Sequence, residues 1–177
     1  WCDYKQTSFN AVAELINAGH QEIAFLTGSM DSPTSIERLA GYKDALAQHS
    51  IALNEKLIAN GKWTPASGAE GVETLLERGA KFSALVASND DMAIGAIKAL
   101  HERGVAVPEQ VSVIGFDDIA IAPYIVPALS SVKIPVTEMI QEIIGRLIFM
   151  LDGGDFSPPK TFSGKLIRRG SLIALSR

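Results

Sequence analysis

Four short apolar runs in this chain each end in a cluster of small and polar residues, and helix-patterned segments separate most of the runs. The clusters are Thr27-Gly28, Asn60-Gly61-Lys62-Trp63, Ser88-Asn89-Asp90-Asp91 and Gly115-Phe116-Asp117-Asp118. This alternation is typical of a parallel α/β sheet, which binds ligands at the carboxyl ends of its strands. We therefore expect a doubly wound parallel sheet with all four clusters at one edge. Their hydroxyl, amide, carboxylate and aromatic groups suit a neutral, polyhydroxylated ligand.

Hydrophobic periodicity and turn residues predict the individual elements. Helices are expected at residues 7–18, 33–48, 90–103 and 136–152, and strands at 22–27, 57–60, 83–87, 111–115, 130–134 and 166–169. A further helix ends at Gly79 and has two possible starts, Thr64-Pro65 or the capping box that begins at Ser67. Residues 119–129 contain two prolines, so we expect neither a regular helix nor a central strand there.

Two of the expected helices show an apolar face at helical spacing. The first should bury Phe9, Val12, Ala13 and Ile16, and the second should bury Ile36, Leu39, Ala40 and Leu46. The helix at 136–152 is apolar nearly all round, so we expect it to be covered on more than one side.

Composition limits the class of protein. At 177 residues, with 47% hydrophobic and 20% charged residues, the chain fits one large domain, or a domain and a piece of another. The net charge is −4 and there is no basic run, so the visible chain lacks the charge distribution of a nucleic-acid surface. The longest apolar stretch, at 143–151, is interrupted by Gly145 and Arg146, so we expect no membrane span.

The few cysteine and histidine residues give no sign of a disulfide or a metal site. Cys2 is the single cysteine, which fits a reducing cytoplasm. His20, His49 and His101 have no partner at metal-ligand spacing, so we interpret them as surface or capping residues and expect no metal and no cofactor. The opening Trp1-Cys2-Asp3 is typical of a strand that enters a helix, so we interpret the chain as a fragment that lacks its amino-terminal part.

Two long side chains near the strand ends have a functional and a structural interpretation. The forked guanidinium of Arg38 suits two adjacent hydroxyls, but Arg38 also suits a surface ion pair with Asp31 or Asp44. The rigid face of Trp63 suits stacking on a sugar ring, but it also suits the cover of a core edge.

The amide and carboxylate residues carry alternatives as well. Asn89 suits the N-cap of a helix, with Asp90 and Asp91 as favourable charges in its first turn. Asp117 and Asp118 suit Mg²⁺, acid–base chemistry or hydrogen bonds from sugar hydroxyls. The phosphate-binding, dinucleotide-binding and nucleophile-elbow glycine motifs are absent from the sequence, which favours a binding protein over an enzyme.

Five strings, in this order and spacing, resemble the LacI/GalR family of bacterial transcriptional repressors over essentially the whole chain. They are Ala18-Gly19-His20-Gln21-Glu22-Ile23-Ala24, Glu37-Arg38-Leu39-Ala40-Gly41-Tyr42, Asn89-Asp90-Asp91-Met92-Ala93-Ile94-Gly95-Ala96, Val113-Ile114-Gly115-Phe116-Asp117-Asp118 and Leu166-Ile167-Arg168-Arg169-Gly170-Ser171. The resemblance implies a two-lobed, periplasmic-binding-protein-like effector domain that follows a helix-turn-helix headpiece.

That resemblance also implies an organisation of the chain. Residues 1–128 match the carboxyl-terminal lobe. Residues 129–161 match a crossover and a helix of the amino-terminal lobe, whose remainder is absent together with the headpiece, and residues 162–177 match a return strand and tail.

Site roles follow from the resemblance, residue by residue. Arg38 matches a clamp on sugar hydroxyls, Asn89 a hydroxyl partner, Asp117 a hydroxyl acceptor and Trp63 a stacking ring. Phe116, Thr34 and Ser35 are further candidates. Many members have Gln on the crossover where this chain has Ile134, so no polar contact is expected there.

The function implied is that of a cytoplasmic, homodimeric sensor. D-galactose or a close analogue would bind between the lobes and change operator binding by the headpiece. The interface of the dimer would include residues 119–129 and 92–101. Two alternatives stay open: an exported sugar-binding protein of a transporter, and a doubly wound metal-dependent enzyme using Asp117 and Asp118.

Overall fold

The computed structural model describes residues 1–155, 158 and 160–175. It contains five helices in this part of the chain: α1 (Tyr4–Asn17), α2 (Pro33–Gln48), α3 (Pro65–Glu77), α4 (Asp90–Glu102) and α5 (Val136–Leu151). The strands are β1 (Ile23–Thr27), β2 (Ile58–Asn60), β3 (Ala84–Ala87), β4 (Ser112–Phe116), β5 (Ser130–Lys133) and β6 (Lys165–Ile167). They form one sheet in the order β2-β1-β3-β4-β5-β6, in which every neighbouring pair is parallel except β5 and β6.

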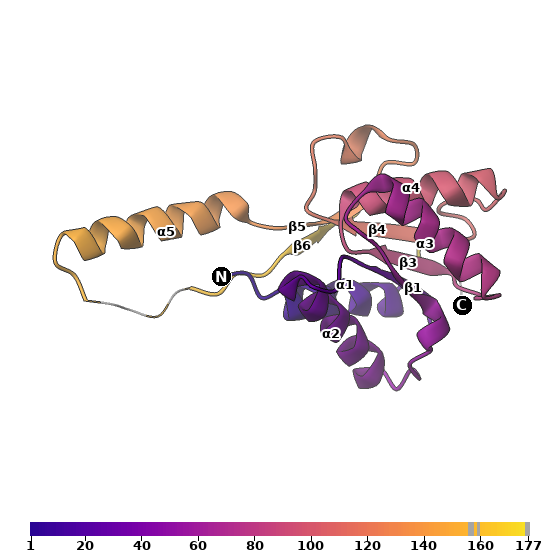
Figure 1. Cartoon of the computed structure of the whole chain (residues 1–177), viewed down its shortest axis with the longest axis horizontal. Helices are drawn as coiled ribbons and strands as arrows, with labels where there is room; N and C mark the ends of the chain where they lie inside the picture. The colour runs from indigo at the N-terminus through magenta and orange to yellow at the C-terminus, as the bar shows by residue number, and fades with distance from the viewer. Residues whose placement is uncertain (156–157, 159, 176–177) are drawn as a thin grey trace.

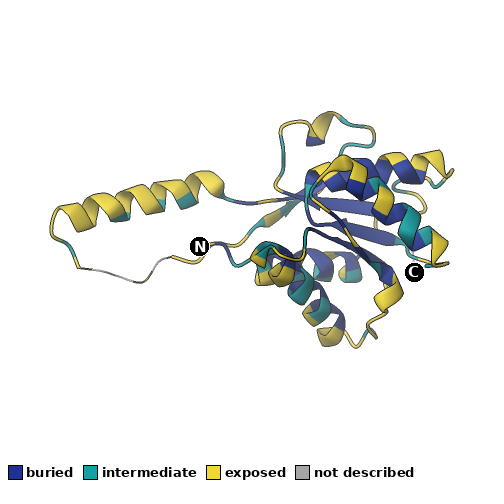
Figure 2. Ribbon diagram, in the orientation of Figure 1, coloured by how far each residue is buried: buried dark blue, intermediate teal, exposed yellow. Residues whose placement is uncertain are grey.

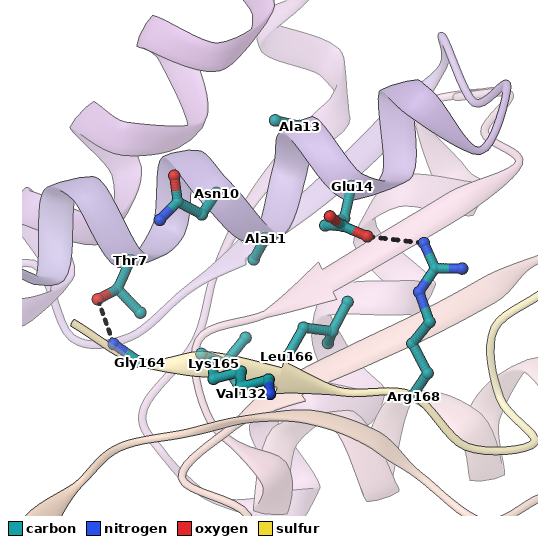
Figure 3. A pocket seen from close by; sticks show the side chains of 10 residues that line it. All are labelled: Thr7, Asn10, Ala11, Ala13, Glu14, Val132, Gly164, Lys165, Leu166 and Arg168. Carbon is teal, nitrogen blue, oxygen red and sulfur yellow. Dashed lines mark hydrogen bonds and ion pairs between the residues drawn. The ribbon is translucent and has the colours of Figure 1, made fainter.

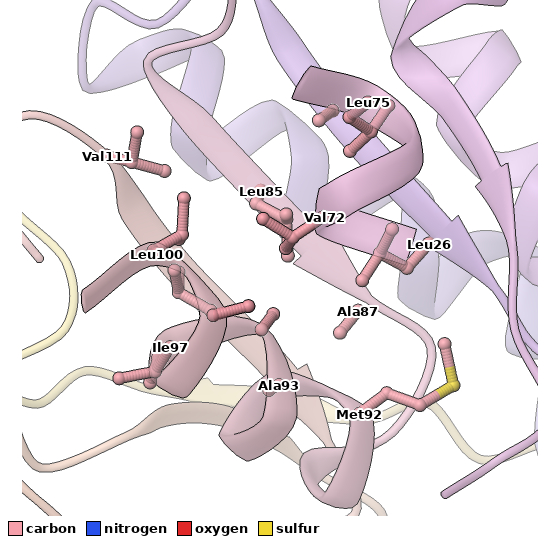
Figure 4. Close-up of a cluster of buried hydrophobic side chains, with 14 of the residues drawn as sticks. Leu26, Val72, Leu75, Leu85, Ala87, Met92, Ala93, Ile97, Leu100 and Val111 are labelled. Carbon is pink, nitrogen blue, oxygen red and sulfur yellow. The ribbon is translucent and has the colours of Figure 1, made fainter. Parts of the chain in front are cut away.

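Helices cover both faces of the sheet, as a doubly wound fold requires. Helices α1 and α2 pack together on one face, and α3 and α4 pack together on the other (Figure 1). Successive side chains of β1 point to opposite faces: Phe25 joins the core under α1 and α2, whereas Leu26 joins the core under α3 and α4 (Figure 4). Strands β1, β3 and β4 are therefore buried on both faces, which explains their continuous apolar sequences.

Side-chain caps decide where the helices begin. Asp3 Oδ1 accepts a hydrogen bond of 2.7 Å from the amide of Gln6, so α1 begins at Tyr4 rather than at the expected residue 7. Thr64 and Ser67 form a reciprocal capping box, so of the two possible starts for α3 the one at Thr64-Pro65 is correct.

The predicted buried faces of α1 and α2 were partly wrong. Ile36 is 52% exposed, and Phe9 and Leu39 are only partly buried. The buried faces include small and hydroxyl residues as well as larger ones: Thr7, Ser8, Ala11, Val12 and Leu15 in α1, and Ser35, Arg38, Gly41, Tyr42, Ala45 and Leu46 in α2. The reason is the close approach of the two helices, since a Cβ on Gly41 would lie 2.1 Å from the carbonyl oxygen of Lys5.

The surface interpretation of His20 was also wrong. Its side chain is fully buried between Ser83 Oγ, 2.9 Å from Nδ1, and the carbonyl oxygen of Ile173, 3.1 Å from Nε2. His20 therefore links the turn before β1 to the start of β3 and to the carboxyl-terminal tail. His49 and His101 are exposed, as expected.

The segment between β4 and β5 is irregular, as its prolines predicted. It contains one short 3₁₀ turn, Ala122–Tyr124, and it exposes the apolar side chains of Ile121, Tyr124 and Val126. We call these three residues the apolar loop patch.

Helix α5 stands away from the rest of the molecule (Figures 1 and 2), and none of its residues is buried. Strand β5, which leads to it, is part of the sheet, and β6 returns beside β5. Trp1 to Asp3 run next to Phe162, with a bridge between Cys2 and Phe162. The division at residues 1–128, 129–161 and 162–177 stays a prediction. No helix in the described part of the chain combines the length and hydropathy of a membrane span.

Candidate functional site

The carboxyl ends of β1 to β4 bring the four polar clusters together. Thr27 Oγ1 lies 3.2 Å from Asn60 Oδ1, and Asn89 Nδ2 donates a hydrogen bond of 3.0 Å to the carbonyl oxygen of Trp63. Arg38, from α2, then contacts the ends of β3 and β4. The predicted site residues from three strand ends and one helix therefore meet at one edge, which we call the strand-end site.

Arg38 lies at the centre of the strand-end site. It is 3% exposed, and its two terminal nitrogens donate to the carbonyl oxygen of Ser88 and, over 3.2 Å, to Asp117 Oδ1. Its guanidinium carbon lies 4.3 Å from the centre of the Phe116 ring and 5.0 Å from that of the Tyr4 ring. Burial lowers the pKa of Arg38, and the carboxylate of Asp117 opposes that shift. The alternative ion pair with Asp31 or Asp44 is not formed; Asp44 instead pairs with Lys5.

Two polar atoms of α2 remain unsatisfied in the strand-end site. Arg38 Nε and Ser35 Oγ are buried and have no hydrogen-bond partner among the described residues. Buried polar groups normally have partners, so two unsatisfied atoms within one turn of α2 are unusual.

Asp117 and Asp118 adopt positive φ angles of 101° and 54°, and their carboxylates find different partners. Asp117 pairs with Arg38, whereas Asp118 pairs with Arg169 over 2.6 Å. Within the described residues, no three His, Cys, Asp or Glu side chains are grouped as a metal site would require. The two neighbouring carboxylates therefore form ion pairs with different arginines.

Asn89 is the N-cap of α4, because its Oδ1 accepts a 2.9 Å hydrogen bond from the amide of Met92. The capping interpretation is therefore confirmed. The amide group of the same side chain holds the backbone of Trp63, which has a φ of 65°. Asn89 thus fixes the position of the aromatic residue, and its contact with a ligand stays a prediction.

The indole ring of Trp63 lies against Gly28 at the end of β1. A Cβ on Gly28 would lie 2.2 Å from the ring, so only glycine leaves room for this position. Trp63 is partly buried, which leaves part of its surface accessible at the strand-end site.

Tyr4 belongs to the site although the sequence analysis did not select it. Its ring covers the guanidinium of Arg38, and it shares a cavity of about 420 Å³ with Thr34, Glu37 and Met139. Asp3 is the sequence signal that could have identified Tyr4. An aspartate at this position can cap a helix, which puts Tyr4 in the first turn of α1, and α1 packs on α2.

A second cavity of about 420 Å³ lies between α1 and the edge strand β6 and contains none of the predicted residues (Figure 3). An ion pair of 2.7 Å between Arg168 and Glu14 closes one end, and a hydrogen bond of 2.9 Å from the Gly164 amide to Thr7 Oγ1 closes the other. Four of its polar side chains, Thr7, Asn10, Glu14 and Arg168, are paired within the protein, so the strand-end site remains the better candidate.

Comparison with known proteins agrees with this architecture. The model of the periplasmic binding protein-like domain matches residues 12–172. The chain belongs to this family. A crystal structure of a sugar-binding transcriptional regulator of the LacI family from Escherichia coli, complexed with phosphate, superposes with a TM-score of 0.96 at 96% identity, over 99% of this chain and 63% of that one. The domain is accordingly the effector-binding type of LacI-family regulators.

Curated relatives point the same way. The transcriptional regulator AscG of Escherichia coli is 96% identical over 177 residues, which is 100% of this chain and 53% of AscG. The regulator GalR of Escherichia coli is 33% identical over 171 residues, which is 96% of this chain and 50% of GalR. The chain thus spans about half the length of these relatives, and they are regulators rather than enzymes. The expected family and fold are confirmed.

Proposed function

We propose that this chain forms the sugar-contacting half of the effector domain of a transcriptional repressor. The observation that carries the proposal is the strand-end site, in which Arg38, Asp117, Asn89 and Trp63 converge beside the unsatisfied atoms of Arg38 and Ser35. The similar regulator from Escherichia coli that is described as sugar-binding supports this reading of the site.

The chemistry of the strand-end site favours a neutral sugar. The Asp117 carboxylate is 43% exposed and can accept hydrogen bonds from hydroxyl groups, while the buried guanidinium of Arg38 holds it in place. The face of Trp63 suits the apolar C–H face of a pyranose ring. The sequence has no glycine-rich phosphate-binding loop, so a nucleotide would lack its usual anchor.

We take D-galactose or a close analogue as the first sugar to test. The similarity to GalR supports this choice, but the much higher identity to AscG means that other hexoses and their glycosides belong in the same test. Thr34 precedes Ser35 in α2, and the buried ring of Phe116 contacts the guanidinium of Arg38, so we propose that both influence which sugar fits.

In the regulator as a whole, the sugar would act by favouring one arrangement of two lobes over another. It can shift that equilibrium only through different affinities for the two arrangements. The arrangement would set how well paired headpieces fit operator DNA in the cytoplasm. Pairing implies a homodimer, and the apolar loop patch is the part of this chain that we assign to its interface.

Calorimetry on the full-length regulator tests the proposal. D-galactose, D-glucose and a disaccharide of each are titrated, with ATP and NAD⁺ as non-sugar ligands. We expect at least one sugar to bind and the nucleotides not to bind. Tight nucleotide binding without a response to any sugar would overturn the proposal.

A further inference from the structure

Asp90, the first residue of α4, is a fully buried carboxylate next to the strand-end site. Its Oδ1 accepts a hydrogen bond of 2.6 Å from the hydroxyl of Ser131 in β5, and its Oδ2 accepts one of 2.9 Å from the amide of Ile119. Because Asp90 has no accessible surface, it cannot touch a sugar. Asp90 can therefore influence sugar binding only through the residues with which it forms hydrogen bonds.

Those residues form the turn that carries Asp117. Three successive amides of the turn have partners outside it: Asp117 N donates to the carbonyl oxygen of Val132 over 2.9 Å, Asp118 N to Ser131 Oγ over 3.0 Å, and Ile119 N to Asp90. Two of the three anchors therefore depend on the Asp90–Ser131 pair. Asp117 and Asp118 both adopt positive φ, which non-glycine residues keep only when their surroundings hold them.

The space that this carboxylate occupies exists because residue 115 of β4 is a glycine. A Cβ on Gly115 would lie 2.2 Å from Asp90 Oδ1. Three elements therefore meet at this point: α4 supplies the Asp90 carboxylate, β5 supplies the Ser131 hydroxyl, and β4 supplies Gly115.

Burial makes the ionised form of the Asp90 carboxyl unfavourable. Burial, together with the nearby charges of Asp117 and Asp118, raises its pKa to about 6, although the bonds from Ser131 and Ile119 act in the opposite direction. A carboxyl with a raised pKa in the folded state stabilises the fold most below its unfolded pKa, and that contribution is lost as the pH rises through about 6. Asp90 therefore contributes less to the stability of the fold at neutral pH than at acidic pH, and such perturbed carboxyl groups are common at functional sites.

We infer that Asp90 is a positioning residue for effector binding. Together with Ser131 it holds the turn of residues 117–119 so that the Asp117 carboxylate faces Arg38 and the sugar. The inference rests on the proposed function of the strand-end site.

A double-mutant cycle in the full-length regulator tests the coupling. Sugar affinity is measured by calorimetry for Asp90→Asn, Asp117→Ala and the double variant, with the sugar that the parent protein binds among D-galactose, D-glucose and their disaccharides. Asp90→Asn alone should weaken binding about tenfold, but it should weaken it less than about twofold when Asp117 is already alanine. Equal losses in both backgrounds would show that Asp90 does not act through Asp117 and would overturn the inference.

Matched controls separate positioning from charge and from folding. Asp91→Asn removes a carboxylate from the same helical turn and should leave sugar affinity unchanged; a loss equal to that of Asp90→Asn would mean that charge at the helix start is the cause. Ser131→Ala replaces Asp90→Asn in the cycle should the latter fail to fold.

Hydrogen exchange at the amides of residues 118 and 119 provides a readout without any sugar. Both Asp90→Asn and Ser131→Ala should accelerate exchange there, and unchanged exchange would refute the positioning role by itself. A parent protein that binds none of the sugars would instead refute the proposed function, and with it the role of Asp90 in effector binding.

Discussion

Asp90, Asp117 and Asp118 show how three nearby carboxylates acquire different environments. Asp117 is half-exposed and pairs with a buried arginine, Asp118 is mostly buried and pairs with Arg169, and Asp90 is buried and bonds to a hydroxyl and an amide. The positive φ angles at residues 117 and 118 direct the two side chains to different partners. The Asp117 carboxylate is thus left available to a ligand.

Asp117→Asn should weaken sugar binding while the fold persists. A hydrogen bond to a charged group contributes about 1.5–3 kcal/mol, so the loss of the carboxylate should reduce affinity at least tenfold, as measured by calorimetry. Arg38 is buried, so loss of its carboxylate partner should also lower the free energy of unfolding, although the Oδ1 atom of asparagine can still accept the hydrogen bond from Arg38. Asp44→Asn, which removes an exposed carboxylate that pairs with Lys5, should leave affinity unchanged. Unaltered binding by Asp117→Asn would remove this residue from the site.

His20 should make stability depend on pH in the acid range. Burial lowers its pKa from 6.5, so the unfolded chain takes up a proton more readily than the folded chain does. Its contribution to stability is then present above about pH 6.5 and is lost as the pH falls towards the lower folded-state pKa.

Urea unfolding of the parent and of His20→Gln measures this contribution. The parent should be the more stable of the two at about pH 7.5, and the difference should shrink at about pH 5. A difference that stays constant with pH would show that His20 does not titrate in this way. His49→Gln is the matched control, since His49 is exposed.

Among the elements, α3 and α4 are held in close contact by two glycines. A Cβ on Gly95 would lie 1.8 Å from the carbonyl oxygen of Pro65, and one on Gly68 would lie 2.1 Å from that of Met92. Both obstacles are backbone atoms, so a side chain at either position would have to push the helices apart. The N-cap of α4 belongs to the strand-end site, so this contact also positions Asn89.

Gly95→Ala should therefore destabilise the fold by about 3 kcal/mol, the upper range for overpacking. Gly145→Ala is the matched control, because it lies within α5 with nothing within 4 Å of its Cβ and should favour the helix by about 1 kcal/mol. Thermal unfolding followed by circular dichroism compares the two. Similar effects of both substitutions would contradict the close contact between α3 and α4.

Helix α5 should be poorly protected in the isolated chain of residues 1–177. It exposes nine large apolar side chains, each of which would gain about 1.5–3 kcal/mol from burial. We expect it to associate with another copy or to exchange its amides rapidly, as measured by hydrogen exchange at several protein concentrations. Strong protection of residues 139–151 in a monomer would show that α5 packs within this lobe, and that the proposed division of the chain is wrong.

At the scale of the whole molecule, the apolar loop patch should contribute to a homodimer. Tyr124 is 78% and Val126 is 91% exposed, although both are apolar residues in a segment that the sheet does not cover. Tyr124→Glu in the full-length regulator should shift sedimentation towards monomer. Glu109→Lys, at an exposed residue before β4, is the control and should have no effect. A dimer that withstands Tyr124→Glu and Ile121→Glu would place the interface elsewhere.

Sequence alone determined the order of the elements and the gathering of the strand-end clusters. Apolar runs followed by polar residues are local signals, and parallel strands bring their carboxyl ends to one edge wherever they occur. Trp63, Asn89 and Asp117 could therefore be placed at that edge, whereas Arg38 and the site roles of all four residues rested on the resemblance to the LacI/GalR family. The irregular segment after Asp118 could be predicted from its prolines. The structure brings these four residues together as that reasoning required.

Only the tertiary structure decided which side chains are buried against which partners. Periodicity gave the apolar face of α2, but the close approach at Gly41 selected the face that carries Ser35 and Arg38 instead of Ile36. The burial of His20 depends on the tail more than 150 residues later, and the role of Asp90 depends on a hydroxyl in β5. Such contacts join residues far apart in sequence through shape and hydrogen-bond geometry, and no local pattern of residue types encodes them.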